Sequence, residues 1–317
     1  MYHLRFGLMV NKLTQPLVLI TQIQRSGGTL LSQLLDGHPQ VCAHPHELHI
    51  GKPMKWDWPM LDMRDSPESW FSYLYEKRLE SFYHNGYVKP GSNPHAKKEV
   101  LPFNFDAELQ RQVFLDSLKQ SPTKLQRDVL NAFFTSFFHA WSDVTIDGER
   151  RLISAFCPRV LMADGSRGRF LADYPDGFFL SSIRDPLTWF ASSRRHNPIY
   201  QDVSAAIEAW VTSTLSILET KLQFAENIFV TTYEKLVTET ELVMRDISKF
   251  VGIDFHDALL MPTYASRPIL PNSSYARKDY GINVDSLNTQ DSIDDQSREY
   301  IEKHAVPLYK RAQLISE

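Results

Sequence analysis

The chain has 317 residues, 43% of them hydrophobic and 12% aromatic, so it can bury a sizeable core as one α/β domain with insertions. Its formal net charge of −4 argues against a nucleic-acid partner or a membrane-surface role as a bulk property. The two cysteines, Cys42 and Cys157, are too few for a disulfide framework and favour a reducing compartment. No apolar run approaches the length of a membrane span, and residues 1–16 lack a signal-peptide core, so we expect a cytoplasmic protein.

The first predicted elements are a strand, a loop and a helix. Residues 17–20 form a short continuous apolar run, which is typical of a parallel strand buried on both faces. The chain then turns through residues 24–29. Leucines follow at helical spacing, and the predicted helix stops near Gly37. The loop therefore lies at a helix N-terminus.

This location favours the binding of an anion. Backbone N–H groups and the positive end of the helix dipole meet there, and Gly27 and Gly28 allow close approach. The nucleotide-binding loop G-x-x-x-x-G-K-[ST] would need a glycine in place of Gln22 and a lysine in place of Gly28. The cation stands upstream instead, at Arg25, which disfavours ordinary Mg-ATP chemistry. A glycine turn with a solvated arginine remains the alternative.

A second strand is predicted at about 40–43, and the segment His44-Pro45-His46-Glu47-Leu48-His49 follows it. Titratable side chains just past a strand end are well placed, because open α/β sheets bind ligands at that edge. A carboxylate or an imidazole there can act as a general base. The pattern H-x-H-E-x-H would also suit zinc, and a purely structural turn is a further alternative.

Residues 52–150 differ in character and form a predicted helical insertion. Helices are expected at 67–83, 106–119 and 125–141, and aromatic residues are dense throughout. Stacking on a sugar or an aromatic acceptor would use such residues. Packing between the helices is the preferred interpretation for most of them.

The sheet is expected to resume near 160–163 and again at 177–183. The second of these strands precedes Arg184-Asp185-Pro186, and Pro186 suits the first turn of the next helix. That helix carries Ser192, so the Arg184 cation and this hydroxyl can reach one phosphate. On its own, however, Arg-Asp-Pro is a common turn from a strand into a helix.

A further strand from Ile228 ends at Tyr233-Glu234, and a helix is predicted at 240–251 with Gly252 as its C′ residue. Residues 262–290 are expected to form a loop that contains the basic pair Arg277-Lys278. The final segment, about 291–314, is predicted as a helix interrupted by Pro307.

Three of these segments resemble sulfotransferases that use 3′-phosphoadenosine 5′-phosphosulfate (PAPS). The run Arg25-Ser26-Gly27-Gly28-Thr29-Leu30-Leu31 after a buried strand resembles the 5′-phosphosulfate loop of that family, and R-D-P-x5-S is similar to its 3′-phosphate segment. The Tyr233-Glu234-Lys235-Leu236 segment, with its following helix, matches a third motif. The resemblance implies a P-loop NTPase-like sulfotransferase fold, with a central parallel sheet flanked by helices.

The resemblance also implies roles for individual residues. Arg25 would contact the bridging and sulfuryl oxygens, and Ser26, Gly27, Gly28 and Thr29 would bind the 5′-phosphate. Arg184 and Ser192 would bind the 3′-phosphate, Tyr233 would lie near the adenine or simply pack, and Arg277 and Lys278 would close over the 3′-phosphate or be solvated. Leu30 stands where many members have an adenine-stacking tryptophan. Gln24 replaces the usual proline, and Asp279 replaces a glycine. Together these residues would give a net acidic chain four local cations.

We therefore expect a single sulfotransferase domain over 1–317, with an acceptor-binding insertion at 52–150 and a mobile loop over the cofactor at 262–290. The expected reaction moves a sulfuryl group from PAPS to a hydroxyl, with an amine as second choice, of a small-molecule or carbohydrate acceptor. Glu47 is the preferred general base and His46 the reserve. The product is 3′,5′-adenosine bisphosphate, and no metal is required. A nucleotide kinase and a non-catalytic nucleotide- or carbohydrate-binding protein are the alternatives, and a homo-oligomer is left open.

Overall fold

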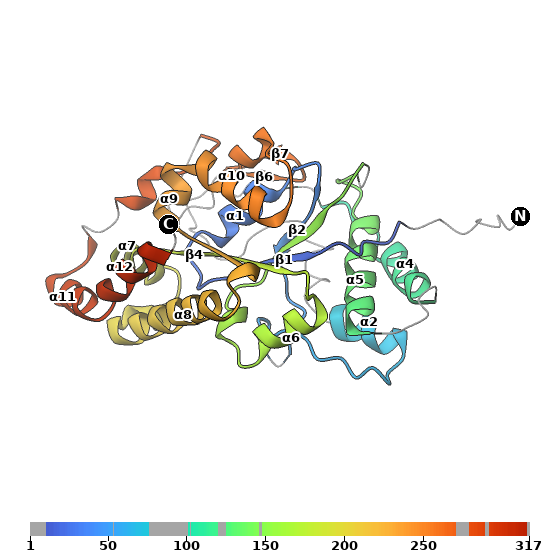
Figure 1. Ribbon diagram of the computed structural model, residues 1–317, viewed down its shortest axis with the longest axis horizontal. Helices are drawn as coiled ribbons and strands as arrows, with labels where there is room; N and C mark the ends of the chain where they lie inside the picture. The colour runs from blue at the N-terminus through green and yellow to red at the C-terminus, as the bar shows by residue number, and fades with distance from the viewer. Residues whose placement is uncertain are drawn as a thin grey trace, which may run out of the picture.

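The computed structural model describes residues 11–52, 54–75, 101, 103–119, 125–145, 148–270, 279–288 and 292–315. Its centre is a parallel five-stranded sheet with the order β2-β3-β1-β4-β5 (Figure 1). The strands are β1 (Leu17–Ile20), β2 (Val41–Glu47), β3 (Leu152–Phe156), β4 (Phe178–Ile183) and β5 (Ile228–Thr232). Because all the strands are parallel, their carboxyl ends meet at one edge, where ligands bind in open α/β sheets.

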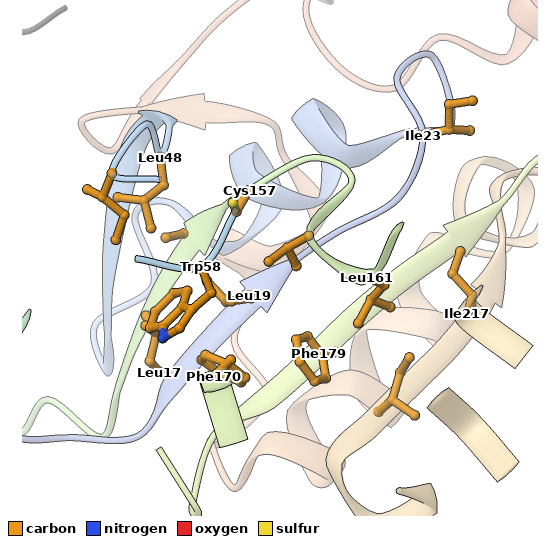
Figure 2. Packing of buried hydrophobic residues seen from close by; sticks show 14 of the residues in the cluster. Leu17, Leu19, Ile23, Leu48, Trp58, Cys157, Leu161, Phe170, Phe179 and Ile217 are labelled. Atoms are coloured by element: carbon orange, nitrogen blue, oxygen red, sulfur yellow. The ribbon is translucent and has the colours of Figure 1, made fainter. Parts of the chain in front are cut away.

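The strands are apolar along their length because both faces of the sheet are covered. In β1, Leu17 and Leu19 pack into one hydrophobic cluster, and Val18 and Ile20 pack into the other. All four side chains are fully buried. Figure 2 shows the first of these faces, where Leu17 and Leu19 lie near Trp58, Phe170 and Phe179. A continuous apolar run in the sequence thus corresponds to a central strand, as predicted.

Helices form a separate layer on each face of the sheet (Figure 1). One layer consists of α1 (Gly28–Leu35), α9 (Tyr233–Thr238) and α10 (Thr240–Val251). The other contains α6 (Ser166–Asp173) and α8 (Val203–Gln223). Beside α8 pack α7 (Pro186–Ser193), α11 (Asp295–His304) and α12 (Val306–Ile315). The predicted parallel sheet with helices on both faces is confirmed.

The predicted helical insertion contains α2 (Pro67–Tyr75), α4 (Ala107–Lys119) and α5 (Gln126–Ala140). These helices pack against one another, α4 and α5 along most of their length. Most of the insertion's aromatic residues that the structure describes are buried in the core, as the preferred interpretation requires: Trp58, Trp70, Tyr75, Phe114, Phe133, Phe134, Phe137, Phe138 and Trp141.

The third strand lies earlier in the chain than the sequence analysis predicts. It is Leu152–Phe156, which pairs with β1, whereas the apolar run near 160–163 forms a single 3₁₀ turn, η1 (Val160–Met162). Arg159, immediately before this turn, has a left-handed φ of 66°, which is incompatible with a continuing strand. The prediction of a strand at 160–163 is therefore wrong.

β2 is longer than predicted. After an irregularity that follows Ala43, Glu47 pairs with Phe156, so the segment from His44 to Glu47 belongs to the strand end rather than to a turn. This pairing places Glu47 at the carboxyl edge of the sheet, next to β3.

The remaining elements lie at the periphery of the sheet. They are η2 (Pro198–Gln201), η3 (Ala225–Asn227), η4 (Asp257–Leu260), the hairpin β6 (Thr263–Tyr264) and β7 (Arg267–Pro268), and η5 (Val284–Leu287). Gly252 ends α10 with a φ of 75°, as predicted, and the last helix is split at Ala305, close to Pro307. Within the described ranges, no helix is both long and apolar enough to cross a membrane.

Candidate functional site

The loop between β1 and α1 forms a backbone cradle at the carboxyl edge of the sheet. Gly27 is the N-cap of α1, with a φ of 94°, so no capping side chain covers the N–H groups of the first turn. A Cβ on Gly27 would lie 2.7 Å from the Tyr233 ring. A Cβ on Gly28 would lie 1.9 Å from Gln22 Nε2 and 2.4 Å from the Phe156 ring. Only glycine fits at these two positions, and its small size exposes the helix N-terminus to an anion.

Side chains from β4 and α7 hold the backbone of this loop. The Ser182 hydroxyl donates a hydrogen bond to the carbonyl of Ser26. The Trp189 indole N–H donates to the carbonyl of Gln24 at 2.8 Å. Between these anchors, Arg25 has a left-handed φ of 68°, a conformation that costs a non-glycine residue free energy and persists only where the surroundings enforce it.

Arg25, Arg184 and Ser192 lie together in the structure, as the sequence predicts. Arg184 Nη1 donates to the carbonyl of Arg25 at 3.0 Å, and Arg25 Nε donates to the Ser192 hydroxyl at 3.0 Å. Arg184 is only 3% exposed. Burial, and then the charge of Arg184, lower the pKa of Arg25. Two adjacent, partly desolvated cations are unfavourable unless an anion binds beside them.

Tyr233 packs directly on these groups. The Arg184 guanidinium lies 4.5 Å from the centre of the Tyr233 ring, and its Nη2 donates to the carbonyl of Ser286 at 2.6 Å. The hydroxyls of Tyr233 and Ser286 are 2.7 Å apart. Ser286 belongs to η5, so the described part of the late loop reaches the proposed 3′-phosphate cation, a contact that the sequence does not predict.

Glu234 positions the turn that carries Arg184. One of its carboxylate oxygens accepts the N–H of Asp185 at 3.1 Å, and the other accepts the Tyr309 hydroxyl at 2.6 Å. Burial raises the pKa of Glu234. In the third motif, Tyr233 therefore packs against Gly27 of the loop, and Glu234 binds the turn after β4.

Glu47 lies across β3 from the loop. Its Oε2 accepts from Lys55 Nζ at 2.9 Å and lies 3.2 Å from His49 Nε2. The side chain is 28% exposed, so an acceptor hydroxyl can reach this carboxylate. In the part of the chain that the structure describes, no cluster of three or more His, Cys, Asp or Glu side chains is arranged to hold a metal.

Two buried polar side chains at the loop have no hydrogen-bond partner within the described residues. They are the Ser26 hydroxyl and the Gln22 amide, with exposed fractions of 1% and 2%. Orphaned buried polar groups cost free energy unless a ligand satisfies them. Sequence reasoning noted Gln22 only as a departure from the nucleotide loop.

The sequence analysis also missed Arg159. Its Nε donates to Gln24 Oε1 at 2.9 Å, and its Nη2 donates to the Tyr200 hydroxyl at 2.6 Å. These partners are far from Arg159 in the sequence, and no local pattern marks them.

Some predicted residues cannot be placed. Arg277 and Lys278 lie outside the described residues, as does the side chain of His46. Leu30 is partly buried at the start of α1 and packs against the cluster on that face.

The fold is a parallel α/β fold in which a glycine-containing loop joins the first strand to the uncapped N-terminus of the first helix. The model of the sulfotransferase family matches residues 16–257, which is most of the chain. The protein therefore belongs to the sulfotransferase family and is a sulfotransferase enzyme.

One solved structure supports the fold, and a second is reported for its similarity alone. The sulfotransferase domain of the Synechococcus PCC 7002 olefin synthase is 19% identical, with a TM-score of 0.51 over 97% of this chain and 96% of that one. A sulfotransferase from Alicyclobacillus acidocaldarius is 14% identical, with a TM-score of 0.48 over 95% and 96% of the two chains. No curated protein sequence matches this chain. The predicted sulfotransferase fold is confirmed.

Proposed function

We propose that this sulfotransferase uses PAPS as donor, moves its sulfuryl group to an acceptor hydroxyl and releases 3′,5′-adenosine bisphosphate (PAP). The main observation behind the proposal is that Arg25 contacts both Arg184 and Ser192 beside the glycine cradle. The buried Arg184, the half-buried Arg25 and a helix N-terminus suit a ligand with two separate phosphate groups.

The residues of the cradle fit the 5′-phosphosulfate. Ser26 to Thr29 would bind the phosphate, and the unpartnered Ser26 hydroxyl and Gln22 amide supply further groups for it. A nucleotide kinase would need a lysine in place of Gly28, where even a Cβ has no room. This steric limit favours PAPS over Mg-ATP.

The other end of the nucleotide would lie against Arg184 and Ser192, with Tyr233 and Leu30 on the adenine side. The proposal keeps Arg277 and Lys278 as cations of the loop at 262–290 that closes over the 3′-phosphate. Ser286 supports this arrangement, because its carbonyl already contacts Arg184.

PAPS supplies an activated sulfuryl group when it is bound. Glu47 would accept the proton of the acceptor hydroxyl, while Arg25 and the α1 N-terminus stabilise negative charge. Lys55 orients the Glu47 carboxylate from the insertion, which supports the assignment of the segment at 52–150 to acceptor binding. The acceptor would be a small molecule or a carbohydrate.

Replacing the proposed base tests this assignment. Glu47→Gln removes the proton acceptor and keeps the shape, so turnover should fall about a hundredfold or more, within the range for general bases. PAP affinity should stay unchanged, because Glu47 does not touch the cradle. The measurements are transfer of radiolabelled sulfate from PAPS and calorimetric titration with PAP. Unchanged turnover would exclude Glu47 and leave His46 as the candidate.

A further inference from the structure

Arg159 is a cation at the mouth of the site that the proposed cofactor does not use. It follows β3 at the carboxyl edge, where its backbone N–H donates to the carbonyl of Gln22 at 3.2 Å. Its φ of 66° is left-handed, which is costly for a residue with a side chain and typical of functional positions. The side chain is half-buried and remains accessible from solvent.

Neutral groups fix the orientation of this guanidinium. Gln24 Oε1 and the Tyr200 hydroxyl accept from it, and the Trp56 ring centre lies 5.2 Å from its Cζ. Gln24 thus forms the link between the Arg159 side chain and the loop. Nε and Nη2 of Arg159 donate to Gln24 and Tyr200, so Nη1, held in a fixed direction, is the nitrogen that can donate to an oxyanion.

No acidic side chain neutralises Arg159 within the described part of the chain. In contrast, Lys55, the neighbouring cation of the insertion, is paired with Glu47. The Arg159 charge is therefore available to a ligand. Because the side chain is half-buried, water screens this charge only partly.

Arg159 follows the strand that pairs with the proposed base, since Glu47 pairs with Phe156, three residues before Arg159. Lys55 contacts Glu47 and Trp56 contacts Arg159, and these two residues are adjacent in the chain. Three residues extend over about 10 Å at most, so the base and this cation lie on neighbouring parts of one sheet edge. A small acceptor that offers its hydroxyl to Glu47 can place a second group at Arg159.

We infer that the acceptor is a hydroxylated anion whose carboxylate or phosphate group binds Arg159 beside Trp56. This inference rests on the proposed function and narrows its acceptor class. The carboxylate and phosphate share one chemistry, an oxyanion that accepts a hydrogen bond from a charged donor, and binding experiments can distinguish them.

The test uses the full chain saturated with PAP, so that Arg25 and Arg184 are occupied. Calorimetric titrations then compare benzoate, phenyl phosphate and benzamide, which is the neutral counterpart of benzoate and has nearly the same shape. We expect benzoate or phenyl phosphate to bind at least tenfold more tightly than benzamide. The preferred anion identifies the acceptor group as a carboxylate or a phosphate.

A variant and a matched control locate the anion. Arg159→Met should weaken its binding at least tenfold. Arg167→Met should leave it unchanged, because Arg167 on α6 also has only neutral partners, Thr220 and Gln223, and packs on an aromatic ring. PAP affinity, measured first, shows that each variant is folded.

Equal binding of benzamide and both anions by the wild-type protein would overturn the inference without any variant. So would an Arg159→Met variant that binds the anion as the wild type does. Failure of PAP itself to bind would instead overturn the proposed function on which the inference rests.

Discussion

Arg25 and Arg184 are 159 positions apart in the sequence, yet the carbonyl of one accepts from the guanidinium of the other. Burying two like charges together is unfavourable unless an anion compensates for their desolvation. The arrangement is therefore the one expected of a site that binds an anion. At this scale the two arginines support the proposal of a bisphosphorylated ligand.

Removal of either arginine should weaken PAP binding. Arg184→Ala and Arg25→Ala should each cost about 1.5–3 kcal/mol of binding free energy, the range for hydrogen bonds to charged groups. Calorimetric titration with PAP measures the effect, and Arg64→Ala, at an exposed arginine paired with Asp62, is the control. Wild-type PAP affinity in both site variants would remove these arginines from the cofactor site.

The residues that the sequence could not identify share one feature, which is that their roles depend on tertiary contacts. Arg25 and Arg184 are recognisable because each follows a strand within a motif, and Ser192 because it stands eight residues after Arg184 in the same motif. Arg159 and Ser286 stand in no such motif, and their partners come from distant segments. Local pattern could predict which residues are candidates for phosphate binding, but not the residues from distant segments that contact them.

At the scale of elements, the predicted helices and most strands are found, and β3 shows why one was missed. Ser154 and Ala155 weaken the apolar signal of Leu152–Phe156, although both residues are buried. The run near 160–163 is more apolar but follows Pro158 and the left-handed Arg159. Hydrogen-bonded pairing with β1 decides which of the two segments becomes the strand. The hydrophobic pattern of one segment alone does not reveal that pairing.

Glu234 connects three elements, since it lies on α9 and binds the turn before α7 and Tyr309 of α12. Its pKa is raised above the ordinary value of 4.5, chiefly by burial, so the native state binds more protons than the unfolded state between these two values. The contribution of this carboxyl to stability is therefore lost as pH rises through that window.

Glu234→Gln removes the titration and keeps the shape. Relative to the wild type, the unfolding free energy of the variant should increase as pH rises above about 4.5, because only the wild type must ionise this buried carboxyl. Urea unfolding at several pH values measures the difference, with Glu241→Gln on the exposed face of α10 as control. A difference that is independent of pH, or that falls as pH rises, would contradict the role assigned to burial.

At the scale of the whole molecule, one hydrophobic cluster joins the sheet to the helical insertion. Leu17 and Leu19 of β1 belong to the same cluster as Phe134 and Phe137 of α5. A continuous core couples the stability of the parts that share it. We therefore expect the sheet and the insertion to unfold together.

Phe137→Ala should lower the unfolding free energy by about 3–5 kcal/mol, as for other buried phenylalanines, in one transition. Far-UV and near-UV circular dichroism should give coincident unfolding curves. Leu125→Ala, at a side chain that is 62% exposed, should change stability by about 0.5 kcal/mol or less. Separate transitions would mean that the insertion unfolds independently of the sheet.

The identity of the cofactor is tested most directly by calorimetric titration with PAP in EDTA, beside a titration with ATP and magnesium. We predict tight, metal-independent binding of PAP and no binding of ATP. The cradle has no room for the lysine that binds nucleotide phosphates in the usual loop, and Arg184 is placed to bind a second phosphate group. Binding of Mg-ATP without binding of PAP would contradict the assignment of PAPS as donor.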